Sequence, residues 1–229
     1  MRQDLYQYER YKARLGDDAP RSFRAFRQLK KTGGEAWGIL EAQHKGMGYY
    51  EKALKNEPAI TKTVVDVAEK VGTEPAGLEF RIKSKESYLR KIKSNYRPDG
   101  NEYEIKDILR YTYISPPETL TGKTIKSIDE FDKMGYNTIG VKNSWLRDYD
   151  PYNGINTIIT APNGQKFEMQ YHTPESFALK NGALHKLYEK QRLIKDDEHP
   201  EYTRLQKEMF ELSKGLEKPN NIEKVKDKK

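Results

Sequence analysis

A strand–turn–strand pattern in residues 152–172 constrains the fold of this chain more than any other feature. Two short apolar runs flank Pro162-Asn163-Gly164, a combination typical of a tight turn between paired strands. Because strand side chains alternate, one face of the second strand carries a carboxylate, an amide and an imidazole, from Glu168, Gln170 and His172. The other face is apolar, with Phe167, Met169 and Tyr171. We therefore expect the apolar row in a core and the polar row facing a ligand.

The composition narrows the class of protein. A chain of 229 residues is long enough for one well-buried domain with helical additions. Its 42 basic and 35 acidic residues give a net charge of +7, which suits a polyanion such as nucleotide phosphates or RNA without requiring one. With no cysteine, disulfides and thiolate metal sites are excluded. Neither a membrane span nor a signal peptide is visible, so we expect a cytoplasmic site of action.

The remaining pattern predicts helices, then strands interleaved with helices, then helices again. Residues 1–71 are expected to be helical, with breaks at Gly33-Gly34 and at Glu57-Pro58. Besides the strand pair, strands are expected at residues 78–83, 107–114 and 138–141, and helices at residues 85–94, 125–134, 174–192 and 201–216. This order predicts an α+β fold: a mixed β-sheet of about five strands flanked by helices, with an N-terminal helical region.

Two further segments carry clear local signals. Pro116, Pro117 and Gly122 indicate a loop before the predicted helix at residues 125–134. Lysine-rich residues 218–229 are expected to be frayed.

A group of basic and hydroxyl side chains surrounds the predicted junction of strand and helix near residue 84. Arg81 and Lys83 would share one face of the strand, and Ser87 and Lys91 one face of the helix. Anions are favoured near a helix N-terminus, and arginine and lysine bind phosphates. The group therefore indicates a phosphate site; the alternative is a solvated basic face.

Two acidic side chains are candidates for a metal site. Asp107 opens a predicted strand and Glu168 lies on another strand of the same predicted sheet. Magnesium prefers oxygen ligands and usually shares them with substrate phosphates, so the pair is consistent with one Mg²⁺. Taken alone, each acid is better explained as a surface residue or an ion-pair partner.

The segment before the strand pair combines an aromatic ring, a glycine and an amide. Tyr152 is suited to stack on a base and Gly154 to allow close backbone approach, although a simple turn explains both. Lys142 and Arg147 add positive charge just before them. His172 and His185 have no recognisable metal-ligand partner in the sequence.

In their order along the chain, these residues resemble the synthetase domain of the RelA/SpoT family. The resemblance rests on Arg81-x-Lys83-x-x-x-Ser87-x-x-x-Lys91, the acid at Asp107, Tyr152-x-Gly154-x-Asn156, and Glu168-x-Gln170-x-His172-Thr173. It covers roughly residues 78–192. It divides the chain into an N-terminal helical region (1–77), a pyrophosphokinase core (78–192), a C-terminal helix (193–217) and a basic tail (218–229).

The resemblance implies an activity: transfer of pyrophosphate from ATP to a nucleotide 3′-hydroxyl, which yields alarmones. It implies that Arg81, Lys83, Ser87 and Lys91 hold the ATP phosphates and that Asp107 binds Mg²⁺. Glu168 would share the metal or help to deprotonate the attacking hydroxyl, with Gln170 beside it. Tyr152 would stack on the acceptor base; the other candidate acceptor-binding residues are Asn156, Gln170, His172, Lys142 and Arg147.

The chain departs from the family pattern on the acceptor side. Asn156 replaces a histidine, and His172 stands where arginine is common. The family also contains toxins that make adenosine alarmones or pyrophosphorylate the tRNA 3′ end. The departures therefore favour a growth-inhibiting toxin whose acceptor is a purine nucleotide or, alternatively, tRNA. The resemblance to such toxins implies a cognate immunity or antitoxin protein and delivery into a target cell by a route that the sequence does not show. The alternative from a different class is a non-catalytic RNA- or partner-binding module.

Overall fold

The computed structural model describes residues 2–98, 100, 104–148, 150–194 and 196–228. The chain divides into two compact units. The first comprises Met1–Pro58 and Ile82–Leu109, and the second Ala59–Arg81 and Arg110–Lys229. Within the described ranges, no helix has the length and apolar character needed to cross a membrane.

The first unit is helical. It contains α1 (Arg2–Leu15), α2 (Phe23–Thr32), the first part of α3 (Gly34–Val71) and α4 (Lys85–Asn95). Tyr8 and Tyr11 of α1 pack on Phe26 of α2, with ring centroids 5.6 and 5.4 Å apart, and Phe26 lies 5.4 Å from the Trp37 ring. The helices predicted within residues 1–71 and at residues 85–94 are therefore confirmed, except for one predicted break in α3.

Helix α3 differs from its prediction in one respect. The sequence predicts a break at Glu57-Pro58, but α3 continues through Pro58 for 38 residues. A proline inside a helix loses one hydrogen bond and crowds the preceding turn. Ala53, Ile60 and Val64 are almost completely buried. Packing of this face therefore outweighs the local cost of the proline.

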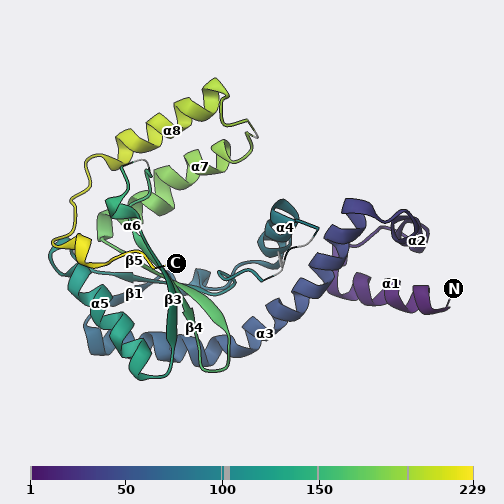
Figure 1. The fold of residues 1–229 in the computed structure, drawn as a ribbon, viewed down its shortest axis with the longest axis horizontal. Helices are drawn as coiled ribbons and strands as arrows, with labels where there is room; N and C mark the ends of the chain where they lie inside the picture. The colour runs from purple at the N-terminus through teal and green to yellow at the C-terminus, as the bar shows by residue number, and fades with distance from the viewer. Residues whose placement is uncertain (1, 99, 101–103, 149, 195, 229) are drawn as a thin grey trace. The chain divides into compact units, whose positions relative to one another are not determined.

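The second unit is built on a five-stranded mixed sheet (Figure 1). Its strands are β1 (Glu74–Ala76), β2 (Arg110–Ile114), β3 (Asn137–Asn143), β4 (Ile155–Thr160) and β5 (Lys166–His172). They are arranged in the order β1-β2-β5-β4-β3, with β2 parallel to β5 and the other pairs antiparallel. The predicted α+β fold with about five strands is confirmed.

One face of this sheet is the core of the second unit. Tyr111 and Tyr113 of β2 pair in register with Met169 and Tyr171 of β5, and all four side chains are buried. Helix α5 (Pro117–Lys133) packs on this face, with the rings of Phe131 and Phe167 6.0 Å apart. The last turns of α3 also cover it, where the Tyr113 hydroxyl donates to the Val64 carbonyl at 2.5 Å. The predicted apolar face of β5 is thus confirmed.

In the described part of the chain, three α-helices follow β5. They are α6 (Pro174–Leu179), α7 (His185–Gln191) and α8 (Pro200–Ser213), with a π-helical turn, Lys180–Leu184, between the first two. Thr173 caps α6 through a reciprocal pair of hydrogen bonds with Ser176. A small core of Leu184, Leu187, Leu205 and Met209 joins α7 to α8. The predicted helices at 174–192 and 201–216 are confirmed, apart from the π-helical turn.

The predicted strand at residues 78–83 is wrong. Residues Leu78–Phe80 form a 3-10 helix and Arg81 has helical backbone angles. Of residues 78–83, only Ile82 makes a β-bridge, to Leu109. The edge of β2 that such a strand needs is taken by β1, which pairs with residues 112–114. Arg81 and Lys83 therefore do not share a strand face.

Three other predictions need correction. Pro117 is the first residue of α5, a position that suits proline, so the predicted loop through Gly122 is helical. Strand β2 begins at Arg110, and Asp107 lies in the turn before it. Residues 220–228 are packed rather than frayed, since Ile222 and Val225 are buried, whereas Lys229 lies outside the described residues.

We expect the sheet core to dominate the stability of the second unit. Phe167 is fully buried, so Phe167→Ala should lower the free energy of unfolding by about 3–5 kcal/mol. The matched control is Phe80→Ala, because Phe80 is 78% exposed and its loss should change stability by no more than about 0.5 kcal/mol. Urea unfolding followed by circular dichroism measures both. Equal effects at the two positions would contradict this assignment of the core.

Candidate functional site

The second face of the sheet carries a row of polar side chains across four strands. In register, Lys142 of β3 pairs with Asn156 of β4, Asn156 with Gln170 of β5, and Gln170 with Thr112 of β2. Directly paired residues project to the same side of a sheet. One register step away, Glu168 of β5 pairs with Arg110 of β2. The sheet itself therefore gathers these side chains from distant parts of the sequence.

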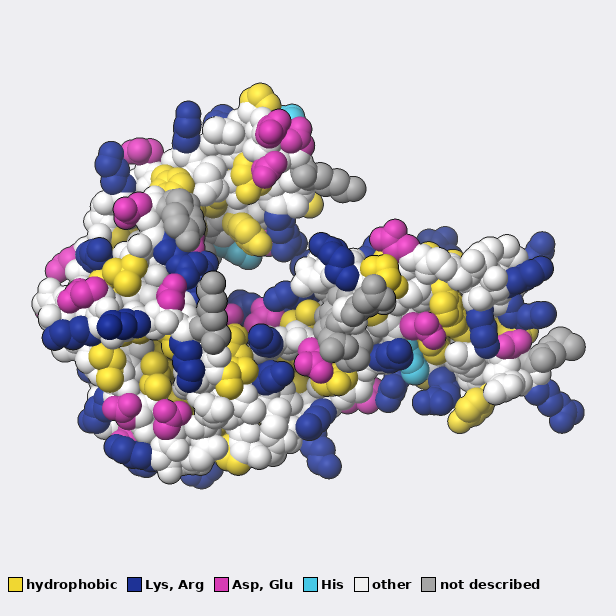
Figure 2. All heavy atoms as spheres, viewed as in Figure 1, with side chains coloured by type: hydrophobic (Ala, Val, Ile, Leu, Met, Phe, Trp, Pro, Cys, Tyr) yellow, Lys and Arg dark blue, Asp and Glu magenta, His cyan; other side chains and the backbone are white. Residues whose placement is uncertain are grey.

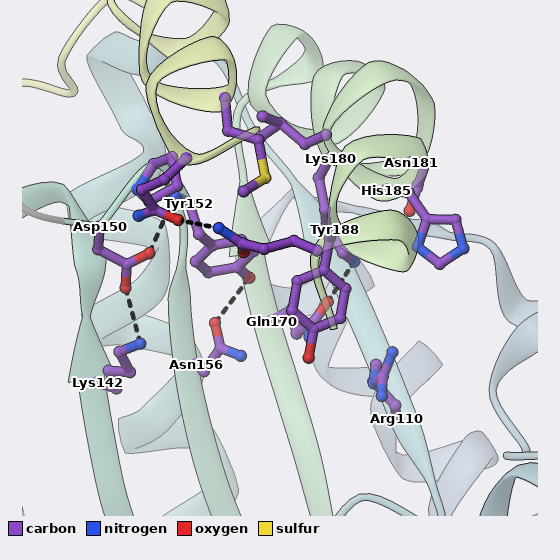
Figure 3. A pocket seen from close by; sticks show the side chains of 15 residues that line it. Arg110, Lys142, Asp150, Tyr152, Asn156, Gln170, Lys180, Asn181, His185 and Tyr188 are labelled. Atoms are coloured by element: carbon purple, nitrogen blue, oxygen red, sulfur yellow. Dashed lines mark hydrogen bonds and ion pairs between the residues drawn. The ribbon is translucent and has the colours of Figure 1, made fainter. Parts of the chain in front are cut away.

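A cavity of about 610 Å³ lies over this polar face (Figure 3). Arg110, Asn156 and Gln170 line it from the strands, and Tyr152 lines it from the loop before β4. From the other side, Lys180 of the π-helical turn and the side chains of α7 line it, among them His185 and Tyr188. A cavity of this size is within the range typical of small-molecule sites.

A continuous chain of polar contacts joins three lining residues of the pocket, Arg110, Gln170 and Lys180. It passes through Glu168, which lies outside the lining. The Arg110 Nε lies 3.2 Å from Glu168 Oε1, and the same oxygen accepts a hydrogen bond from Gln170 Nε2 at 2.5 Å. The side-chain carbonyl oxygen of Gln170 accepts a hydrogen bond from Lys180 Nζ at 2.5 Å. The amide of Gln170 thus links an acidic group to a basic one and fixes both.

Lys180 is an unusual cation. Burial, reinforced by the positive charge of Arg110, lowers its pKa to about 8, although Glu168 opposes the shift. Its position follows from the π-helical turn Lys180–Leu184, a local widening that often occurs at functional sites. Near neutral pH the ammonium group is therefore charged, yet it loses its proton more readily than an exposed lysine.

Tyr152 is held by two hydrogen bonds. Its hydroxyl donates to Asn156 Oδ1 at 2.7 Å and lies 2.8 Å from His172 Nε2. Burial, followed by the nearby carboxylate of Glu168, holds the pKa of Tyr152 well above its usual value, so the phenol stays protonated. Tyr152 lines the pocket, as a stacking role requires, and that role stays a prediction.

His172 is fully buried and lies outside the lining of the pocket. Its Nδ1 lies 2.9 Å from the Ser176 hydroxyl, and its ring packs edge-on against Tyr152. Burial and the charge of Lys180 lower the pKa of His172 to about 3, so the imidazole is neutral. The placement is that of a support for Tyr152. Of the polar row of β5, only Gln170 lines the cavity, so the expectation that the whole row faces a ligand needs correction.

The contact between Tyr152 and His172 requires a glycine at position 154. A Cβ atom at Gly154 would lie 2.5 Å from His172 Cε1 and 2.8 Å from the Tyr152 hydroxyl, closer than side chains tolerate. The sequence suggested that this glycine allows close backbone approach. The group that approaches it is the Tyr152–His172 pair.

Lys142 and Arg147 have acidic partners in the structure. Lys142 lines the pocket and pairs with Asp150 at 2.8 Å. Arg147 pairs with Asp227 at 2.5 Å and lies outside the pocket lining.

The first unit contains a separate cluster of the predicted phosphate-binding residues. The carboxylate of Asp107 lies 3.2 Å from Lys83 Nζ and 2.9 Å from Lys91 Nζ. Ser87 lies near the start of α4, where the Ser84 side chain caps the helix, and Lys91 follows one turn later on the same face. Arg81 belongs to the second unit, where its guanidinium donates to the Leu78 carbonyl at 2.7 Å.

The predicted metal site is divided between the two units. Asp107 belongs to the first and Glu168 to the second, so their pairing around one ion stays a prediction. Among the described residues, no three acidic or imidazole side chains gather as a metal centre. Magnesium commonly takes one or two carboxylates together with substrate phosphates and water, so the donor chemistry of the two acids fits.

Sequence reasoning missed much of the lining of the pocket, including the polar residues Arg110, Asp150, Lys180 and Tyr188. The sequence could have indicated Arg110. Side chains alternate along β2, so Arg110 lies on the same face as Thr112 and on the opposite face from Tyr111 and Tyr113. Lys180 carried no such signal. A regular helix from residue 174 would not show the π-helical turn that places it.

Comparison with known proteins shows similarity in structure only. No family model and no curated protein matches the sequence. The chain superposes on the type VI effector Tas1, solved with its immunity protein, with a TM-score of 0.53, 23% identity, and coverage of 73% of this chain and 93% of that one. Small alarmone synthetase 1 from Bacillus subtilis, bound to its product pppGpp, gives a TM-score of 0.48 at 12% identity, covering 73% of this chain and 87% of its own. Small alarmone synthetase 2 from Bacillus subtilis gives 0.47 at 19% identity, covering 72% and 88%. The similarity to Tas1 shows a shared fold.

We expect the buried charge of Lys180 to destabilise the protein near neutral pH. An unfolded lysine has a pKa of about 10.4. Because the folded value is about 8, the unfolded chain binds more protons between these values, and wild-type stability rises with pH across this window. Lys180→Met removes the charge but also the hydrogen bond to Gln170. The free energy of unfolding of the variant should therefore exceed that of the wild type by about 2 kcal/mol at pH 7, and the difference should vanish by about pH 10.

The measurement is urea unfolding of wild type and Lys180→Met at a series of pH values from 7 to 10. The matched control is Lys186→Met, because Lys186 is exposed on α7. A stability difference that does not change with pH would contradict the assigned burial of the charge.

Proposed function

We propose that this protein is an ATP-dependent pyrophosphokinase that transfers the β,γ-pyrophosphate of ATP to the 3′-hydroxyl of a purine nucleotide. The observation that carries the proposal is the pocket of the second unit, where the ring of Tyr152 lies among Asn156, Gln170, Arg110 and Lys180. An aromatic ring beside amides and cations suits a nucleotide, since the ring stacks on a base and the cations attract phosphates.

The ordered family resemblance assigns the donor to a different group of residues. Lys83, Ser87 and Lys91 would bind the ATP phosphates, with Arg81 from the second unit. Two lysines already lie within ion-pair distance of Asp107. A phosphate group entering there would compete with that carboxylate for the lysines, because both are oxygen anions of similar geometry.

Asp107 and Glu168 are the residues that would hold Mg²⁺. When bound, the ion would neutralise charge on the transferred phosphates. The acceptor would bring its 3′-hydroxyl to Glu168, which would accept the proton. A bond would form between this oxygen and the β-phosphorus, the bond from that phosphorus to the bridging oxygen of the α-phosphate would break, and AMP would leave. Such a transfer depends mainly on positioning and charge neutralisation.

The fold shared with Tas1 supports a toxin role at the level of architecture. Tas1 is a type VI effector that was solved with an immunity protein. By analogy, we propose that this chain inhibits growth in the cytoplasm of a target cell and has a cognate immunity partner.

The alternatives rest on charge. Pyrophosphorylation of the tRNA 3′ end drew support from the lysine-rich tail, but residues 220–228 pack on β3 through backbone bonds between Val141 and Lys228. On the face shown in Figure 2, basic and acidic side chains are interspersed. A non-catalytic RNA-binding module would gain little from a carboxylate, that of Glu168, paired with Arg110 beside a pocket for phosphates. We therefore place a purine nucleotide ahead of both.

The first experiment is transfer from ATP labelled on its γ-phosphate, with magnesium and separately with GDP, GTP, ADP, AMP or deacylated tRNA. Because the pyrophosphate includes the γ-phosphate, any acceptor becomes labelled. We expect label in a purine nucleotide and at least a 100-fold loss of rate in Glu168→Gln, about the contribution of a positioned acid–base group.

The matched control is Glu118→Gln, which makes the same chemical change at an exposed position of α5, on the apolar side of the sheet. It should keep the wild-type rate. Label on tRNA would move the protein to the translation-blocking class. No label in any reaction, with wild type and Glu168→Gln binding RNA equally, would replace the enzyme by the binding module.

A further inference from the structure

Residues 220–228, here named the C-terminal segment, run along the outer edge of β3. Lys228 pairs with Val141 through two backbone hydrogen bonds, of 2.9 and 3.0 Å. Ile222 and Val225 of the segment are 1% and 4% exposed, so the segment is packed by apolar contacts as well. An edge strand otherwise leaves its backbone groups unpaired, and this segment satisfies part of that edge.

Asn143, the last residue of β3, is the centre of this contact. Its side chain is fully buried, and its amide nitrogen donates to the carbonyls of Ile222 at 2.9 Å and Val225 at 2.8 Å. Its side-chain oxygen accepts from the Trp145 backbone N–H at 3.2 Å. One buried amide therefore joins the C-terminal segment to the beginning of the next loop.

Asp227 makes a second connection to the same loop. Its Oδ1 accepts from the Asn143 backbone N–H at 2.7 Å, and its Oδ2 lies 2.5 Å from Arg147 Nη2. Burial alone would raise the pKa of Asp227, but these two donors hold it below its ordinary value. The carboxylate thus bridges the end of β3 and a residue four positions further along.

The loop that is tied in this way forms a wall of the pocket. We name it the pocket loop: residues 144–148 and 150–154. Within it, Asp150 accepts from the Ser144 hydroxyl at 3.1 Å and from the Tyr152 backbone N–H at 3.1 Å, and it pairs with Lys142. Asp150 and Tyr152 both line the cavity (Figure 3).

We propose that the C-terminal segment positions the pocket loop, with Asp227 as the positioning residue that sets the affinity of the pocket for its acceptor nucleotide. The contacts run from Asp227 to Arg147 and Asn143, along the loop to Asp150, and from Asp150 to the backbone of Tyr152. The part of the proposal that concerns the acceptor rests on the proposed function.

The structure offers one competing explanation. Arg147 was predicted to bind acceptor phosphates, in which case Asp227 would only neutralise it in the absence of ligand. The two explanations predict opposite results for Asp227→Asn. Freeing an arginine that binds phosphate should strengthen binding or leave it unchanged, whereas loosening the loop should weaken it.

A fluorescence measurement tests the positioning without any catalytic activity. The chain has two tryptophans, and Trp145 lies buried in the pocket loop. In a Trp37→Phe background, Asp227→Asn should increase quenching of Trp145 by acrylamide, because a loop that opens more often exposes its side chains. The matched control is Asp129→Asn on α5, where the aspartate is exposed. Circular dichroism confirms that each variant is folded, and Arg147→Gln provides a second route to break the same ion pair.

The kinetic measurement uses the best acceptor found in the labelled-ATP experiment. We expect Asp227→Asn and Arg147→Gln each to raise the KM for the acceptor about 3- to 10-fold, with the KM for ATP unchanged. The double variant should raise this KM by less than the two single effects combined, because either substitution alone already breaks the ion pair that the two residues share. Additive losses, or a lower acceptor KM in Asp227→Asn, would assign Arg147 to the ligand and overturn the proposal.

The two measurements separate failure of this proposal from failure of the proposed function. If no acceptor is labelled, the proposed function fails, and the quenching of Trp145 still decides whether Asp227 holds the loop. If Trp145 is quenched equally in wild type, Asp227→Asn and Asp129→Asn, the positioning role is wrong even when transfer is observed.

Discussion

The pairing of β5 with β2 and β4 is the constraint on which the second unit depends. Because the register is fixed, the odd-numbered residues of β5 enter the core and Glu168 and Gln170 stand beside Arg110, Thr112 and Asn156. A slip of one residue would turn the apolar row into the pocket and bury the carboxylate. The same hydrogen bonds therefore determine both the stability of the sheet and the composition of the candidate site.

The polar floor depends in turn on groups that do not line the cavity. Tyr152 is fixed by a histidine that is fully buried and neutral, and Gly154 leaves the space in which that contact forms. In the same way, Asp227 contacts the pocket loop from outside the cavity through its ion pair with Arg147. A site whose side chains are held before a ligand arrives loses less conformational entropy on binding.

How much of this was predictable depended on whether the determinant was local in sequence. The alternation of residues 166–172 gave the two faces of β5, and Thr173 with Pro174 gave the start of α6, because both signals are complete within a few residues. The strand expected at residues 78–83 failed because its partner edge was occupied by β1, which is only three residues long and contains Pro75. Arg110 and Lys180 were missed since their roles arise from register across β2 and from a π-helical turn. The lysine-rich composition of residues 218–229 suggested fraying, whereas Asn143, some 80 residues earlier, supplies bonds to Ile222 and Val225 that hold residues 220–228.

The positive charge of the pocket depends on pH through Lys180. Arg110 faces Glu168 and Lys142 faces Asp150, so these two pairs nearly cancel. Lys180 donates to the neutral amide of Gln170, and its pKa of about 8 means that its charge changes close to physiological pH. An anionic ligand that approached Lys180 would raise that pKa and be bound more tightly by the charged form. The attraction for anions would then depend on pH, weakening as pH rises above about 8, a behaviour that the paired cations cannot produce.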